Sequence, residues 1–179
     1  MEKATQPRAF YGSFFHTPEY GSFEYLERAL IEVGEDGAIE RVIAHDDPDQ
    51  AAAVAKAREA GALFELGEGK FGLPGFVDIH VHSPQWPQAA LALDEPLYRW
   101  LDERTFPLES KFADVDFAKE VYSDLVDQLL ARGSTTAVYL GSAHLEATVA
   151  LAEICAERGQ RALVGKTVMD DPAANPDYY

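Results

Sequence analysis

The organising segment of this chain is Leu73-Pro74-Gly75-Phe76-Val77-Asp78-Ile79-His80-Val81-His82. Residues 76–81 are apolar apart from Asp78 and His80 and rich in β-branched side chains, a pattern typical of a strand buried on both faces. The Pro-Gly pair that precedes them favours a turn leading into the strand. The segment is therefore predicted to form an interior strand.

Two histidines, His80 and His82, stand two positions apart near the end of this strand. Side chains at positions i and i+2 of a strand point to the same face, so both imidazoles are expected to emerge side by side. Neutral imidazole binds zinc, and a catalytic zinc commonly takes three protein ligands and leaves one position for water. The pair is therefore predicted to bind a metal ion. The alternative is that one histidine is a satisfied core residue and the other lies in the loop at the strand exit.

Size and composition exclude several classes of protein. The 179 residues suffice for one ordinary domain, or for a small domain and part of another. A net charge of −16 disfavours nucleic acid and anionic membranes as partners, and is explained by solubility. No apolar run is long enough to cross a bilayer and the N-terminus lacks the apolar core of a signal peptide, so a cytoplasmic location is expected.

The chain contains a single cysteine, Cys155, which excludes a disulfide framework and a cysteine-rich zinc site. It lies in an apolar helical pattern, which favours a packing role over that of a nucleophile.

Residues 1–70 are expected to form a small, mostly β domain with one helix. The turn residues 34–37 separate two β-rich runs, which predicts a hairpin. His16 has no partner at a spacing that would make it a metal ligand. The remaining predicted elements are a strand over 8–16 interrupted at Gly12-Ser13, a helix over 50–60 that ends at Gly61, and a short strand over 64–67.

Residues 71–179 are expected to alternate strands with helices, which predicts a parallel sheet in an α/β fold. Such an order matches the first part of a TIM-like (β/α)8 barrel, whose active site lies at the carboxyl ends of the strands. A complete barrel needs about 250 residues, so this barrel is expected to be incomplete. After the opening strand, the predicted elements are a loop over 83–87 held by two prolines, a helix over 95–104 that ends at 105–107, a helix that starts at Asp114 or Asp116 and ends at Gly133, a strand over 134–140, a helix over 144–158, a strand over 161–169 and an irregular tail over 170–179.

The segment Pro74 to His82 resembles the first barrel strand of the amidohydrolase superfamily. Further stretches are more narrowly similar to the guanine deaminase family, and the resemblance spans nearly the whole chain. These stretches are Ser83-Pro84-Gln85, Arg99-Trp100-Leu101 through Thr105-Phe106-Pro107 and Glu109, Gly133-Ser134-Thr135-Thr136-Ala137, Gly165-Lys166 through Met169-Asp170, and Gly12-Ser13-Phe14-Phe15-His16.

This resemblance implies an enzyme of purine catabolism with one zinc ion, which converts guanine to xanthine and ammonia. His80 and His82 would be the first two zinc ligands, and zinc would lower the pKa of bound water so that hydroxide can attack the purine. The resemblance places four residues, His82, Ser83, Pro84 and Gln85, at the substrate, with the Gln85 amide offering donors and an acceptor to the purine. The remaining ligands and the general acid-base residue are expected beyond Tyr179, so the isolated chain is expected to be inactive.

Several alternatives stay open at this point. The chain could serve another ring aminohydrolase of the superfamily, or be an inactive fragment or assembly module. The family implies a homodimer, and a second polypeptide could supply the rest of the barrel. Lys166 could be a carbamylated bridging ligand, although packing is the preferred account, and His144 is either a rim residue or simply the start of a helix.

Overall fold

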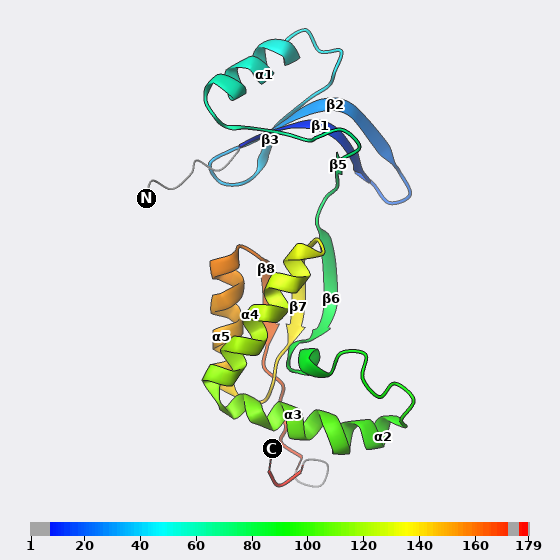
Figure 1. The fold of residues 1–179 in the computed structure, drawn as a ribbon, viewed down its shortest axis with the longest axis vertical. Helices are drawn as coiled ribbons and strands as arrows, with labels where there is room; N and C mark the ends of the chain where they lie inside the picture. The colour runs from blue at the N-terminus through cyan, green and yellow to red at the C-terminus, as the bar shows by residue number, and fades with distance from the viewer. Residues whose placement is uncertain (1–7, 172–175, 179) are drawn as a thin grey trace. The chain divides into compact units, whose positions relative to one another are not determined.

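The computed structural model describes residues 8–171 and 176–178 and shows a mixed α/β protein. The chain divides into two compact units, Met1–Pro74 and Gly75–Tyr179 (Figure 1). The division of the sequence into domains 1–70 and 71–179 stays a prediction. Part of the tail predicted over 170–179 lies outside the described residues.

The first unit is built on a five-stranded sheet with the order β3-β2-β1-β4, in which β5 also pairs with β1. The β2–β3 pair is antiparallel, which confirms the predicted hairpin. β1 runs through Gly12-Ser13 without a break, and the predicted interruption is instead a change of register between Gly12 and Phe14. Such a bulge bends a strand without ending it. The strands are β1 (Ala9–His16), β2 (Glu24–Val33), β3 (Ile39–Ile43), β4 (Leu63–Glu65) and β5 (Phe71–Gly72).

The described part of this unit contains one helix, α1 (Gln50–Glu59), where a helix was predicted over 50–60. Its Val54 joins a small apolar cluster with Ala9, Leu30 and Ile43. The Gln50 side chain donates a 2.7 Å hydrogen bond to the carbonyl of Arg28, so the first residue of the helix is tied to β2.

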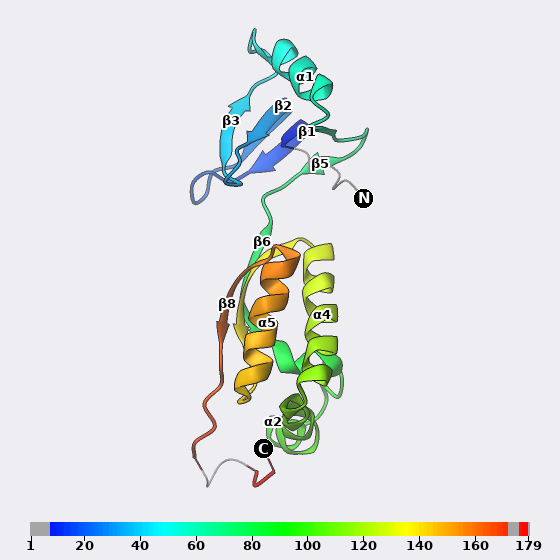
Figure 2. The same ribbon diagram turned by 90° about the vertical axis from the view of Figure 1, so that its left-hand side faces the viewer.

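The second unit is built on a parallel three-stranded sheet with the order β6-β7-β8, which confirms the predicted parallel arrangement. The strands are β6 (Phe76–His82), β7 (Ser134–Leu140) and β8 (Arg161–Gly165). β8 therefore ends four residues before the predicted end at 169. Two helices, α4 (Val115–Ala131) and α5 (Leu145–Arg158), lie together on one face of the sheet (Figures 1 and 2). Their packing buries Tyr122, Leu125, Tyr139 and Leu151 in one core.

Local signals set the ends of both helices. The Asp114 carboxylate accepts hydrogen bonds from the backbone N–H groups of Asp116 and Phe117 at 2.9 and 3.3 Å, so Asp114 is the N-cap of α4. His144 occupies the N-cap position of α5, and Gly159 ends that helix in the left-handed conformation with φ +75°.

The connection between β6 and α4 is more helical than predicted. The loop expected over 83–87 is a 3-10 helix, η1 (Ser83–Gln88). The helix expected to end at 105–107 instead continues through Pro107, which follows a π-helical turn, the kind of irregular turn found where the regular hydrogen-bond ladder of a helix is interrupted. The continuous run comprises α2 (Leu97–Trp100), a π-helical turn η2 (Leu101–Thr105), α3 (Phe106–Glu109) and a 3-10 turn η3 (Ser110–Ala113).

The prediction that β6 is buried on both faces is wrong. Val77 and Ile79 expose 63% and 74% of their surface, although both are apolar. Among the described residues, β6 has β7 as its only strand neighbour, and the helices cover one face of the sheet. The face that carries these side chains is therefore open to solvent.

Candidate metal and substrate site

The carboxyl ends of the three parallel strands meet at one edge of the sheet. His82 pairs with Leu140, and Leu140 pairs with Gly165. Just past these positions, the Gly141 N–H donates a 2.7 Å hydrogen bond to the carbonyl of Gly165. The residue that follows β7 is therefore held against the end of β8.

A bulge in β6 includes His80, the first residue of the histidine pair. Asp78 pairs with Ala137 and Val81 pairs with Tyr139, so Ile79 and His80 together stand opposite Val138. The Asp78 carboxylate accepts a 3.1 Å hydrogen bond from the backbone N–H of His80, which holds this irregular backbone. Bulges of this kind redirect side chains near functional sites.

The two histidine rings converge on one point. Their Nε2 atoms lie 2.9 Å apart, and their ring centroids lie 4.9 Å apart. Zinc–nitrogen bonds of about 2.0–2.1 Å would separate two tetrahedral ligand nitrogens by about 3.3 Å, so a small ring movement would let both atoms contact one ion. The donor set therefore fits a metal ion. In the part of the chain that the structure describes, no third His, Cys, Asp or Glu side chain completes such a group.

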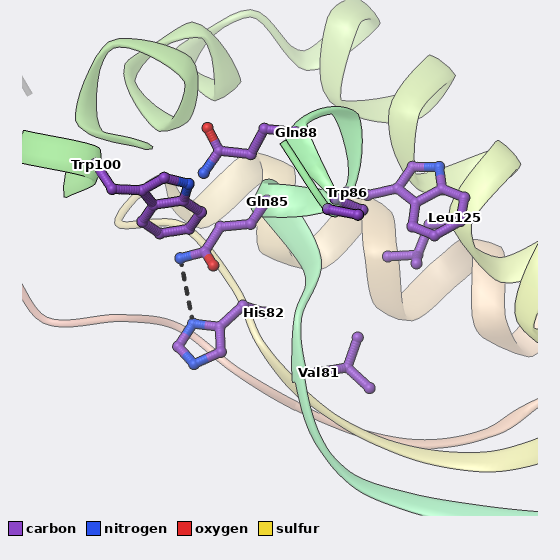
Figure 3. Close-up of a pocket in the computed structure, with 9 residues that line it drawn as sticks. Val81, His82, Gln85, Trp86, Gln88, Trp100 and Leu125 are labelled. Atoms are coloured by element: carbon purple, nitrogen blue, oxygen red, sulfur yellow. Dashed lines mark hydrogen bonds between the residues drawn. The ribbon is translucent and has the colours of Figure 1, made fainter. Parts of the chain in front are cut away.

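Gln85 lies on η1 beside this pair. Its side-chain nitrogen lies 3.5 Å from Nδ1 of His82 (Figure 3). The same nitrogen donates a 3.0 Å hydrogen bond to the Glu109 carboxylate. The Ser83 hydroxyl donates a 3.2 Å hydrogen bond to the carbonyl of Leu140, which ties the start of η1 to β7. The turn that carries Gln85 is therefore anchored to the sheet.

A cavity of about 280 Å³ opens next to His82 and Gln85. Figure 3 shows the Gln85 side chain between the His82 ring and the Trp100 indole. The Trp100 N–H donates a 3.1 Å hydrogen bond to the carbonyl of Leu91, which holds the indole in place. The full lining is Val81, His82, Gln85, Trp86, Gln88, Ala89, Ala90, Trp100 and Leu125.

The sequence-predicted substrate residues are distributed unevenly around this cavity. His82 and Gln85 line it, whereas Ser83 and Pro84 are fully buried outside its lining. Contact of Ser83 and Pro84 with substrate stays a prediction. The sequence predicted Trp100 only as part of the helix over 95–104, and its large aromatic ring was the signal that could have identified it as a cavity wall.

The Tyr122 side chain is buried near the Ser83 and Ser142 hydroxyls. Burial raises the pKa of Tyr122 to about 12, against the lowering effect of the nearby Ser83 and Ser142 hydroxyls, and the Glu109 charge adds to the increase. Within the described residues, the Tyr122 hydroxyl makes no hydrogen bond of normal geometry. The Glu109 charge also acts on the nearby His144, where it opposes the lowering of the imidazole pKa.

His144 is held at the start of α5. Its Nδ1 atom lies 3.2 Å from the Ser142 hydroxyl, and partial burial lowers the pKa of its imidazole. The position agrees with the reading of His144 as a helix-start residue.

Two other chemically reactive side chains, Lys166 and Cys155, are placed as packing residues. The Lys166 ammonium donates hydrogen bonds of 3.2 and 3.0 Å to the carbonyls of Ala143 and Thr167, which supports the packing account over a bridging ligand. Cys155 is buried, and burial raises the pKa of its thiol to about 11, as suits a packing residue.

Among the described residues, no helix is both long and apolar enough to pass through a lipid bilayer.

Comparison with known proteins relates this site to one group of enzymes. Residues 71–178 match the amidohydrolase family. The chain is 39% identical over 180 residues to a guanine deaminase of Dictyostelium discoideum, with 96% of this chain and 39% of that protein covered. It is 36% identical over 171 residues to a guanine deaminase of Homo sapiens, with 94% and 37% covered. The chain thus spans well under half the length of these relatives.

Solved structures show the same relationship. A guanine deaminase from C. acetobutylicum, with guanine bound in its active site, superposes with a TM-score of 0.79 at 28% identity, covering 96% of this chain and 38% of that one. The E. coli guanine deaminase superposes with a TM-score of 0.77 at 29% identity, covering 96% and 39%. Because the family match covers more than half of the chain and includes the histidine-bearing strand β6, this protein belongs to the amidohydrolase family.

Proposed function

We propose that this chain carries the first part of the active site of a zinc-dependent aminohydrolase that converts guanine to xanthine and ammonia. The observation that carries the proposal is the convergence of His80 and His82 beside the Gln85 amide, at the mouth of a cavity. Its support is the similarity of nearly the whole chain to guanine deaminases.

His80 and His82 would hold one zinc ion through their Nε2 atoms. Bound zinc supplies a water molecule of lowered pKa as the nucleophile for deamination. Two imidazoles are half of a tetrahedral ligand set. We infer that the other ligands and the general acid-base residue come from the part of the relatives' length that these 179 residues do not span.

Gln85 would recognise the purine. Its amide can donate two hydrogen bonds and accept others, which suits a heterocycle whose edge alternates donors and acceptors. Trp100 offers a flat aromatic wall next to that amide, and aromatic rings favour stacked contacts with other planar rings. We include Ser83 and Pro84 in the substrate-binding turn because they are the buried residues of η1 that directly precede Gln85, and Ser83 ties this turn to β7.

The exposed face of β6 supports a barrel context for this site. Apolar side chains such as Val77 and Ile79 favour burial, and a closed (β/α)8 barrel would bury them between further strands. We propose that the Gly75–Tyr179 unit is the first part of such a barrel and that the Met1–Pro74 unit is a small β domain preceding it. A second polypeptide or a second copy of the chain could complete or extend the assembly.

The test is ammonia release from guanine together with zinc content measured by mass spectrometry. Both are measured on the 179-residue chain alone, and on the same chain fused to the remaining segment of a related guanine deaminase. In the complete protein, Gln85→Ala is expected to reduce guanine turnover strongly and to leave zinc content unchanged. Gln128→Ala makes the same truncation on α4 outside the cavity and is the matched control.

Two results would overturn the proposal. Turnover of another amino-substituted ring without turnover of guanine would assign the site to a different aminohydrolase. Zinc-free protein with no activity in either form would assign the chain to an inactive assembly module.

A further inference from the structure

Glu109 is a carboxylate buried in the wall behind the candidate site. It exposes only 8% of its surface, and it lies at the end of α3, 24 residues after Gln85. Burying a carboxylate is unfavourable unless hydrogen bonds compensate it. The 3.0 Å hydrogen bond from the Gln85 amide is one such compensation.

This hydrogen bond sets the orientation of the Gln85 amide. A carboxylate accepts hydrogen bonds only, so it must face the NH₂ group of the amide and not its oxygen. Turning the amide over would place its oxygen against the Glu109 carboxylate, with two acceptors in contact. One N–H of Gln85 is therefore committed to Glu109, while the oxygen and the second N–H are left to face other groups.

The second N–H of the Gln85 amide makes only a weak contact with His82. It points to Nδ1 of His82 over 3.5 Å, at the limit of a hydrogen bond. When a histidine binds a metal through Nε2, its proton resides on Nδ1, which then donates and no longer accepts. With zinc on His82, the Gln85 amide keeps its bond to Glu109 and has both its second N–H and its oxygen free for a ligand.

We propose that Glu109 is a positioning residue that orients the Gln85 amide for purine recognition. Gln85 then presents one donor and one acceptor in a fixed order, which selects a ring edge with the complementary acceptor and donor. This specificity rests on the proposed function for its ligand, guanine, whereas the Gln85–Glu109 contact does not depend on it.

The contact is tested first in the chain itself, without substrate. The side-chain NH₂ resonances of Gln85 in ¹⁵N-labelled protein are expected to show slowed hydrogen exchange, which Glu109→Ala abolishes. Glu103→Gln removes the same charge from the same helical run, at an exposed ion pair with Arg99, and is expected to leave these resonances unchanged. Unprotected Gln85 resonances in the unsubstituted chain would overturn the proposal.

Recognition is tested in the complete, zinc-loaded protein. Glu109→Gln is expected to raise the KM for guanine about 10-fold with a smaller change in kcat, as the loss of an outer-shell partner does. In a Gln85→Ala background, Glu109→Gln is expected to have no further effect, because Glu109 acts through Gln85. Glu103→Gln is the control, with KM and kcat unchanged.

A reversed pair separates positioning from folding. Gln85→Glu combined with Glu109→Gln restores a carboxylate–amide hydrogen bond, so thermal stability is expected to return to that of the unsubstituted protein, while KM stays high. Recovery of KM in this double variant would show a purely structural role. If the unsubstituted protein fails to deaminate guanine, the proposed function fails, and the NMR experiment alone decides the positioning role.

Discussion

The Nε2 atoms of His80 and His82 lie 2.9 Å apart at the carboxyl end of β6. At this distance one ring nitrogen can donate a proton to the other, so a single proton occupies the space between the two facing nitrogens. Replacing that proton by a cation needs no rearrangement of the strand, because the bulge at Ile79-His80 is already held by Asp78.

Zinc binding is expected to depend on both rings of this pair. His80→Ala and His82→Ala should each lower zinc affinity by at least about 10-fold, since even outer-shell losses cost that much. Titration calorimetry of the dialysed chain measures the effect. His45→Ala, at an exposed position in the other unit, is the control. Equal zinc affinity in all three variants would contradict the metal site.

A glycine at the entry to β6 is required for close packing against β7. A Cβ atom at Gly75 would overlap the side chain of Thr135. Gly75→Ala is expected to destabilise the Gly75–Tyr179 unit by roughly 1–3 kcal/mol, the usual cost of overpacking. Urea unfolding followed by the fluorescence of Trp86 and Trp100, both in this unit, gives the value.

Gly165→Ala is the matched control for this experiment. A Cβ atom at Gly165 would make an ordinary contact of 3.6 Å with the carbonyl of Tyr139. Its free energy of unfolding is expected to stay within about 0.5 kcal/mol of that of the unsubstituted chain. If both glycine variants unfold at the same urea concentration, the close approach of Thr135 has no energetic effect.

The N-terminus of α4 depends on the Asp114 side chain. Asp114→Ala removes the acceptor for two backbone N–H groups and should cost about 1 kcal/mol of stability. Asp114→Asn keeps an acceptor without the charge and is expected to be nearly neutral, because Asn caps helices about as well as Asp. A large loss in the Asn variant would assign the effect to charge and not to capping.

Three buried acids, Cys155, Tyr122 and Tyr139, are expected to make the stability of the second unit fall at alkaline pH, because burial raises the pKa of each. Burial raises the pKa of Cys155 from 9.0 to about 11 and that of Tyr122 from 10.0 to about 12. The unfolded chain therefore releases these protons at lower pH than the folded chain does. The contribution of Cys155 is constant below pH 9 and is lost as pH rises from 9 to 11, and that of Tyr122 is lost between pH 10 and 12.

Unfolding free energies measured in urea across pH 8–11 give this slope. Cys155→Ala should flatten the curve between pH 9 and 11, even if its overall stability is lower. The same burial should leave the thiol of the folded chain unreactive toward a disulfide reagent at pH 8, with full reactivity in urea. Rapid reaction of the folded chain would contradict the burial of Cys155.

Local patterns were enough to find the histidine pair and most element ends. Alternation along a strand depends on neighbouring residues only, so the side-by-side placement of His80 and His82 followed from their spacing. Capping is equally local: Asp114 begins α4 and Gly159 ends α5 where the pattern indicated. The predicted β2–β3 hairpin and the strand Ser134–Leu140 depend on the same short-range rules.

Contacts between distant segments could not be read in this way. The hydrogen bond from Gln85 to Glu109 forms because the helical run continues through Pro107 and places α3 against η1, where a helix end at 105–107 had been expected. The exposure of Val77 and Ile79 likewise depends on which strands and helices surround β6, and not on its own apolar sequence. Spacing along the chain sets which side chains can point the same way, whereas packing between remote elements sets what they meet.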